Sequence, residues 1–253
     1  MQIHPTEVAD FEEKYDEDGY VIFRNSLNTK KIENLRSKTF EVVNRFSLSG
    51  ESISETIVRL DKEDRPSLFQ LALTLEKSYE FSDICLDFEE IMTTLYPGKR
   101  NFFMAQNLAQ FGLPRDSRIT FDWHQESVYL KDFDDFATFW FTPFDTTEET
   151  RGMSLLRGSH KLGKLNYDAF KLSKEHLLQH VPKNKKELEK QFEEVPVETV
   201  PGDMIVFHPS LIHKSGHNQS NKVRISFAVR IAAIGPVMPV NLCVNDACRN
   251  YTW

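Results

Sequence analysis

The sequence WHQE at residues 123–126 places an imidazole and a carboxylate two positions apart. On an extended segment alternate side chains share a face, so we expect His124 and Glu126 to point the same way. Both can bind one transition metal, which then needs a third ligand from elsewhere in the chain. His213, within HPSLIHKSGHN, is the candidate. Two imidazoles and one carboxylate leave three positions open on iron, an arrangement typical of non-haem Fe(II) oxygenases.

A second carboxylate competes for the role of Glu126. Asp122 lies two residues before His124 and would share the same face of a strand. An isolated H-x-E triplet is common in proteins without a metal, so the metal hypothesis depends on what accompanies it. We expect Glu126 to be the ligand and keep Asp122 as the alternative.

Arg224 is the accompanying residue, eleven positions after His213 in the apolar sequence VRISFAVRI. 2-Oxoglutarate binds iron through its keto-acid end, and its far carboxylate needs a buried cation, which the planar guanidinium of arginine meets with two donors. Ser215 can add a hydroxyl donor. The competing interpretation is that Arg224 is an ordinary strand cation paired with a surface acid.

The elements that would position these residues change character near residue 100. Before it, DGYVIF at residues 18–23 predicts a short strand, a helix capped by Asn28 or Thr29 follows, and Ser67 to Tyr96 predicts a second helical region. After it, short β-rich runs predict a sandwich or barrel, including one across ITFDWHQESVYL. We therefore predict a single domain over residues 1–253, with residues 1–100 as a helical support layer and residues 101–253 as the β core.

One long interruption, residues 161–190, breaks the β-rich half. It carries eight lysines against four acids, the lysines being Lys161, Lys164, Lys171, Lys174, Lys183, Lys185, Lys186 and Lys190. A loop of this length is often a lid, and its charge favours an anionic substrate. The alternative is a solvated helical insert, because lysine runs usually face water.

Composition narrows the class of protein. The chain is 40% hydrophobic and 27% charged, with a formal charge of −7, which argues against a nucleic-acid or membrane-surface partner. The N-terminus lacks the pattern of a secretory signal, and no run is long enough to span a bilayer. Three cysteines without paired spacing favour a reducing compartment, so we expect a cytoplasmic monomer or homodimer.

The order and spacing of these motifs resembles the phytanoyl-CoA dioxygenase family of Fe(II)- and 2-oxoglutarate-dependent oxygenases over nearly the whole chain. Residues 11–36 resemble the family's opening strand and helix, and WHQE resembles its metal motif. RGSHK at residues 157–161 resembles its Gly-Ser-His turn, and residues 201–230 resemble its closing block. One departure is Glu126, where most relatives have aspartate.

The resemblance implies a mixed α+β, mainly β fold: a double-stranded β-helix, or cupin-like jelly roll, with helices. It implies iron on His124, Glu126 and His213, 2-oxoglutarate on Arg224 and Ser215 with Gln125 as a further contact, and dioxygen as the oxidant. The expected reaction is hydroxylation of a small molecule with release of succinate and carbon dioxide. Desaturation, cyclisation, epimerisation and a non-catalytic metal-binding jelly roll remain as alternatives.

Overall fold

Two antiparallel sheets form the centre of the protein. The computed structural model describes residues 5–99, 101–116, 120–131, 133–170 and 178–234. The larger sheet has the strand order β1 (Tyr20–Phe23), β8 (Met204–Phe207), β3 (Phe136–Phe141), β10 (Arg224–Ile234) and β2 (Asn101–Gly112). The smaller sheet has the order β7 (Glu194–Val197), β4 (Met153–Leu156) and β9 (His213–Ser215). The two sheets are joined by one apolar cluster that contains Trp140 and Ala228 from the first and Leu155 from the second.

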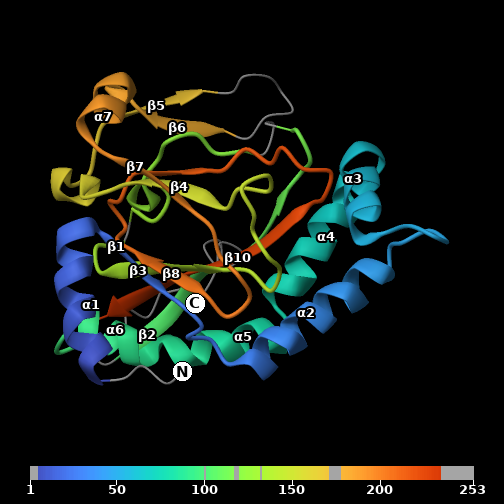
Figure 1. The fold of residues 1–253 in the computed structure, drawn as a ribbon, viewed down its shortest axis with the longest axis horizontal. Helices are drawn as coiled ribbons and strands as arrows, with labels where there is room; N and C mark the ends of the chain where they lie inside the picture. The colour runs from blue at the N-terminus through green and yellow to red at the C-terminus, as the bar shows by residue number, and fades with distance from the viewer. Residues whose placement is uncertain (1–4, 100, 117–119, 132, 171–177, 235–253) are drawn as a thin grey trace, which may run out of the picture.

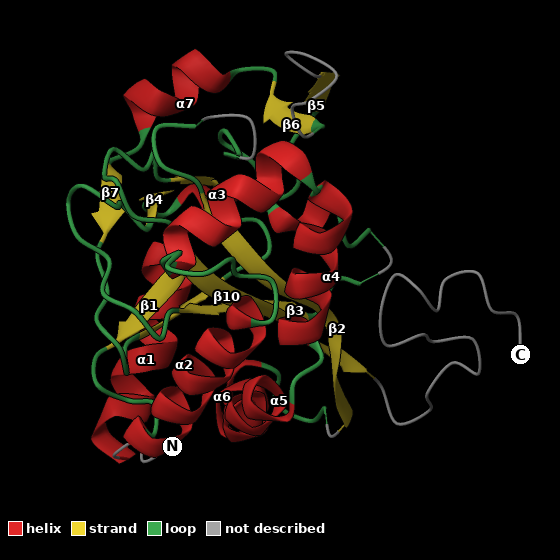
Figure 2. Cartoon of the chain, turned by 90° about the vertical axis from the view of Figure 1, so that its right-hand side faces the viewer, coloured by secondary structure: helices red, strands yellow, loops and turns green. Residues whose placement is uncertain are grey.

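Helices cover the outer face of the larger sheet (Figure 2). They are α1 (Pro5–Asp18), α2 (Thr29–Asn44), α3 (Ile53–Glu63), α4 (Arg65–Glu76), α5 (Tyr79–Cys85) and α6 (Glu89–Leu95). The Phe88 ring stacks on Phe139 of β3 with ring centroids 4.5 Å apart, and Phe81 packs 5.3 Å from Phe227 of β10. The predicted β core with an N-terminal helical layer is confirmed.

Strand β10 shows how the sequence divides the two faces of the large sheet. Ile225, Phe227 and Val229 belong to the cluster shared with the helices. Because alternate residues of a strand face opposite sides, Arg224, Ser226, Ala228 and Arg230 face the space between the two sheets. The strand therefore places two arginines in the interior of the sandwich.

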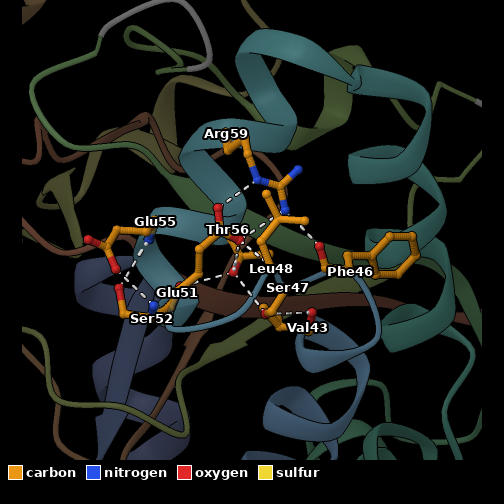
Figure 3. Close-up of polar contacts among 9 residues, drawn as sticks. All are labelled: Val43, Phe46, Ser47, Leu48, Glu51, Ser52, Glu55, Thr56 and Arg59. Carbon is orange, nitrogen blue, oxygen red and sulfur yellow. Dashed lines mark hydrogen bonds and ion pairs between the residues drawn. The ribbon is translucent and has the colours of Figure 1, made fainter.

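The helical half matches the prediction in outline and differs in detail. Helix α2 begins after Asn28, whose side chain accepts hydrogen bonds from the backbone N–H groups of Lys30 and Lys31, as predicted. The predicted helical region over Ser67–Tyr96 consists of several helices, because Ser78 caps a new one through Phe81 N. The prediction had no counterpart to α3, which begins at a capping box formed by Ser52 and Glu55 (Figure 3).

Residues 161–190 are not the long loop that was predicted. Within its described residues, β5 (Tyr167–Phe170) and β6 (Gln179–Pro182) pair as a hairpin, and α7 (Lys185–Gln191) follows. Figure 1 shows the hairpin and α7 beyond the smaller sheet, on the side away from α5 and α6. Among all helices with assigned positions, none is long and apolar enough to cross a membrane.

Candidate active site

Three buried side chains meet between the two sheets: His124, Glu126 and His213. The predicted strand through WHQE is wrong, because His124 forms a single β-bridge to His213 and Glu126 begins a short 3₁₀ turn, Glu126–Val128. The bridge's two backbone hydrogen bonds, of 2.9 and 3.0 Å, bring the imidazole centroids within 4.1 Å. One potential ligand atom from each of the three residues lies within 4.8 Å of the others. These are the three residues that the sequence selected.

Both imidazoles are held in the tautomer that a metal requires. His124 Nδ1 lies 2.7 Å from the carbonyl oxygen of Asp122, and His213 Nδ1 lies 3.0 Å from that of Leu211. A carbonyl oxygen only accepts, so each Nδ1 carries the hydrogen and each Nε2 keeps its lone pair. Burial lowers the pKa of His124 to about 3, and the nearby His213 adds to the effect. The imidazole of His124 is therefore neutral at physiological pH, and its Nε2 can bind a metal.

Glu126 is held by an arginine that the sequence reasoning did not select. Arg230 Nε and Nη2 donate to Glu126 Oε2 at 3.0 and 2.6 Å, while Oε1 lies 3.3 Å from His213 Nε2. Burial acts to raise the pKa of Glu126, but the ion pair with Arg230 outweighs it and keeps the carboxyl ionised. The sequence did contain an indication of this role. Arg230 lies six residues after Arg224, and an even spacing places both side chains on the same face of a strand.

Asp122 lies apart from this group. Its Oδ1 accepts from Trp123 N at 2.7 Å, and its Oδ2 accepts from Lys185 Nζ of α7 at 2.6 Å. The structure thus groups Glu126, and not Asp122, with the two histidines.

Arg224 is a buried guanidinium whose polar partners are backbone carbonyls. Nη1 donates to the carbonyls of Thr150 and Gly216 at 3.1 and 3.0 Å and also to that of Arg151, while Nε has no hydrogen-bond partner. Burial lowers its pKa to about 10, which leaves it a cation at neutral pH. None of the acids in the described ranges pairs with Arg224. The competing interpretation, in which Arg224 forms an ion pair with a surface acid, does not fit this arrangement. The cross-strand neighbour of Arg224 is Gly112, where a Cβ would lie 2.9 Å from the guanidinium carbon.

The two other expected co-substrate contacts have protein partners. The amide nitrogen of Gln125 donates to the carbonyls of Gly163 and Ser210 at 2.8 and 2.6 Å, and its oxygen accepts from Leu165 N and from the Tyr167 hydroxyl. Ser215 Oγ accepts from Phe121 N at 3.4 Å. Contact of Gln125 with the co-substrate stays a prediction, and its hydrogen bonds instead tie the metal motif to residues 163–167.

Aromatic rings surround the two histidines. Phe207 lies 4.7 Å from the His213 ring, and Phe121 and Tyr129 lie 5.3 and 5.8 Å from the His124 ring, all measured between centroids. The Tyr129 ring also packs 5.2 Å from His180 of β6. The hairpin that replaces the expected loop therefore supplies part of the wall around the site.

The lysines of residues 161–190 are partly engaged with acids. Lys164 pairs with Asp134 at 2.7 Å, and Lys183 lies 3.6 Å from Asp168. Together with the ion pair from Lys185, these contacts reduce the free positive charge of the segment. Its role as a lid stays a prediction, and residues 171–177, which include His176, lie outside the described residues.

Comparison with known proteins adds independent information. A model of the family described as phytanoyl-CoA dioxygenase (PhyH) matches residues 15–226. One relative, the 1-deoxypentalenic acid 11-beta-hydroxylase of Streptomyces arenae, is 24% identical over 217 residues, which cover 81% of this chain and 73% of the relative.

Solved structures share the fold at low sequence identity. EctD from S. alaskensis with 2-oxoglutarate and 5-hydroxyectoine has a TM-score of 0.59 at 15% identity, covering 91% of this chain and 77% of EctD. The non-heme alpha ketoglutarate dependent carbocyclase SnoK from nogalamycin biosynthesis has a TM-score of 0.61 at 16% identity, covering 91% of this chain and 84% of SnoK. The matched family model spans most of the chain, so the protein belongs to the phytanoyl-CoA dioxygenase family of enzymes, as its motifs predicted.

Proposed function

We propose that this protein is an Fe(II)- and 2-oxoglutarate-dependent oxygenase that hydroxylates a C–H bond of a small-molecule substrate. The observation that carries the proposal is a buried His124–Glu126–His213 cluster in the same sandwich interior as a buried guanidinium, Arg224, that pairs with none of the described acids. A metal and a dicarboxylate would satisfy both features. Membership of the PhyH family supports the same conclusion.

The three clustered residues fit iron on chemical grounds. Both Nε2 atoms have free lone pairs, because the Nδ1 hydrogens are held by carbonyls. Glu126 directs Oε2 to Arg230 and leaves Oε1 beside His213 Nε2, so it can bind through one oxygen. Two nitrogens and one oxygen on one side of a metal match the donor set of non-haem Fe(II) oxygenases.

Arg224 fits the far carboxylate of 2-oxoglutarate. A buried cation is costly without an opposite charge, and the carbonyl groups around Nη1 only partly compensate it. Its unpartnered Nε offers a charge-assisted hydrogen bond to a carboxylate. Gly112 leaves space beside the guanidinium that any side chain would reduce.

In this mechanism the chain binds the metal and the co-substrate, orients them and keeps water away from the metal. Iron with 2-oxoglutarate and dioxygen supplies the oxidising chemistry, with succinate and carbon dioxide released. His124, Glu126 and His213 would hold the metal, and Arg224 would fix the orientation of the co-substrate from the far end. Phe121, Phe207 and Tyr129 line the histidines with apolar surface that limits access of water to the metal.

Hydroxylation is favoured over other oxidative outcomes by the relative named above, a hydroxylase of an acid. SnoK, which is named as a carbocyclase, shows that the shared fold also accommodates ring formation. Product analysis distinguishes them, because hydroxylation adds one oxygen atom to the substrate, whereas desaturation and cyclisation remove two hydrogens.

Anaerobic addition of 2-oxoglutarate to the Fe(II)-loaded protein tests the proposal directly. We expect a visible charge-transfer band from chelation of iron by the keto acid, and slow succinate formation once oxygen is admitted. Arg224→Ala should weaken 2-oxoglutarate binding by about tenfold or more, because a buried charge-assisted contact is lost. Arg224→Lys should restore part of it, and iron binding should be unchanged in both variants.

Absence of the band and of succinate in the wild type would contradict the oxygenase proposal and favour a non-catalytic metal-binding module. An Arg224→Ala variant with wild-type dependence on 2-oxoglutarate would contradict the assignment of this residue. His213→Ala serves as the reference variant in which both signals should disappear.

A further inference from the structure

The interior of the sandwich holds more positive charge than the proposed reaction uses. Arg224 and Arg230 are both buried, and among the described residues Glu126 is the carboxylate that pairs with either of them. Two imidazoles that bind a metal through Nε2 add no charge. With a divalent metal and a doubly charged 2-oxoglutarate bound, one positive charge remains uncompensated, which is unfavourable in a buried site.

Arg230 also has a donor to spare. Its Nε and Nη2 are used on Glu126, but Nη1 is buried and has no hydrogen-bond partner in the part of the chain that is placed. The side chain as a whole is 6% exposed. Buried polar atoms of this kind are nearly always satisfied in native proteins, so an unpartnered guanidinium nitrogen beside the three candidate metal ligands indicates a bound group.

Two neighbouring hydroxyls share this property. Thr138 lies directly opposite Arg230 on β3, so the two side chains share a face of the sheet, and its Oγ1 is buried without a partner. The Tyr129 hydroxyl is also buried without a partner, and its ring contacts His124. A phenol hydroxyl is protonated at neutral pH, so this group is a hydrogen-bond donor.

We propose that Arg230 Nη1, with the hydroxyls of Tyr129 and Thr138, binds an anionic group of the substrate beside the metal, and that the substrate is therefore a carboxylic acid. This inference rests on the proposed function, because it places the substrate at the same metal. A carboxylate has the planar geometry that two arginine nitrogens or one nitrogen and a hydroxyl can meet, and it supplies the missing negative charge. Arg224, six residues before Arg230 on β10, remains with 2-oxoglutarate.

Binding measured without turnover tests the proposal. The Mn(II)-loaded protein, saturated with 2-oxoglutarate, is titrated calorimetrically with carboxylates and their primary amides: octanoate and octanamide, phenylacetate and phenylacetamide, indole-3-acetate and indole-3-acetamide. We expect at least one acid to bind about tenfold or more tightly than its amide, the effect of a charge-assisted hydrogen bond. Arg230→Gln should abolish this preference, and Arg230→Lys should retain part of it.

Tyr129→Phe, which removes one hydroxyl and little volume, should weaken acid binding about threefold without changing amide binding. Arg45→Gln is the matched control, because Arg45 is an exposed arginine paired with Glu41 of α2 and should leave the preference unchanged. Electron paramagnetic resonance of Mn(II) verifies that every variant is loaded.

Three results would overturn the inference. If the preference for the acid persists in Arg230→Gln, Arg230 does not bind the substrate's anionic group. The same conclusion follows if the wild type shows no preference for any acid over its amide. A loss of 2-oxoglutarate affinity in Arg230→Gln as large as that in Arg224→Gln assigns the free nitrogen to the co-substrate instead. Failure of the wild type to bind 2-oxoglutarate at all is a different result, which contradicts the proposed function.

Discussion

At the scale of single residues, the presence of glutamate where most relatives have aspartate in the metal motif has a structural explanation. Glutamate is one methylene longer than aspartate and has one more rotatable bond, so it needs additional restraint to present a single oxygen. Arg230 provides that restraint by binding Oε2 from two nitrogens. The longer ligand and the buried arginine thus form a unit.

Glu126→Ala should lower affinity for Fe(II) by about tenfold or more and abolish succinate formation, because it removes one of three ligands and leaves Arg230 buried without its anion. Calorimetric titration with Fe(II) under anaerobic conditions measures the affinity. Asp122→Ala is the control, since that carboxylate contacts Lys185 rather than the histidines, and iron should remain bound. Loss of iron in Asp122→Ala with retention in Glu126→Ala would identify the other carboxylate as the ligand.

Gly112→Ala should raise the concentration of 2-oxoglutarate needed for half-maximal succinate formation while iron binding stays near normal. The added Cβ would lie 2.9 Å from the guanidinium carbon of Arg224, closer than such contacts allow, so the arginine must move. Gly50→Ala is the matched control, because a Cβ there would meet no atom within 4 Å, although its positive φ of 84° adds some backbone strain. Equal 2-oxoglutarate dependence in Gly112→Ala and the wild type would show that this glycine does not set the position of Arg224.

At the scale of elements, the turn between α2 and α3 is held by one carboxylate. Glu51 accepts from Arg59 Nε at 2.7 Å and from the backbone of Leu48 at 2.9 Å, and Arg59 also donates to the carbonyl of Phe46 (Figure 3). These contacts, led by the hydrogen bond from Arg59, lower the pKa of Glu51 from 4.5 to about 2. A depressed carboxyl pKa stabilises the folded state above the ordinary pKa, and this contribution is lost as the pH falls toward 2.

Glu51→Gln should therefore lower the free energy of unfolding at neutral pH, and the difference from the wild type should shrink between pH 4.5 and pH 2. Urea unfolding followed by circular dichroism across this range measures it. Glu33→Gln, an exposed position on α2, should show no such pH-dependent difference. A difference between wild type and Glu51→Gln that stays constant with pH would show that the turn does not depend on the ionised carboxylate.

At the scale of the whole molecule, the helical layer and the β sandwich share one core. Phe81 and Phe88 come from the helical half, and they pack on Phe139, Phe141 and Phe227 of the large sheet. The single-domain prediction therefore requires both halves to unfold together. Near-ultraviolet and far-ultraviolet circular dichroism should give coincident transitions.

Phe88→Ala should destabilise the protein by about 3–5 kcal/mol, because a fully buried ring is replaced by a cavity. Urea unfolding measures the loss, and the same shift should appear in the fluorescence of buried tryptophans in the β half, such as Trp140. Phe69→Ala, at a side chain that is 64% exposed, is the control. Two separate transitions, with only the helical one shifted, would contradict a shared core.

The sequence determined the chemistry of the site, because metal binding and carboxylate recognition depend on residue types that are rare in apolar segments. His124, Glu126, His213 and Arg224 were selected from their residue types, their spacing and their resemblance to the family's motifs. The β core and helix α2 also followed from local patterns, namely short apolar runs between turn residues and a capping asparagine. Such patterns act between near neighbours, so they can be read without the fold.

Only the tertiary structure decided which groups are left without partners. Asp122 and Glu126 are equivalent in the sequence pattern, but a lysine from α7 binds the first and an arginine from β10 binds the second. Arg230 was overlooked because a strand arginine acquires its role only when a distant segment lies against it. The free Nη1 of Arg230 and the free Nε of Arg224 are likewise properties of the packed interior. Burial and pairing arise between residues far apart in the sequence, 104 positions for Arg230 and Glu126, and local sequence patterns do not show them.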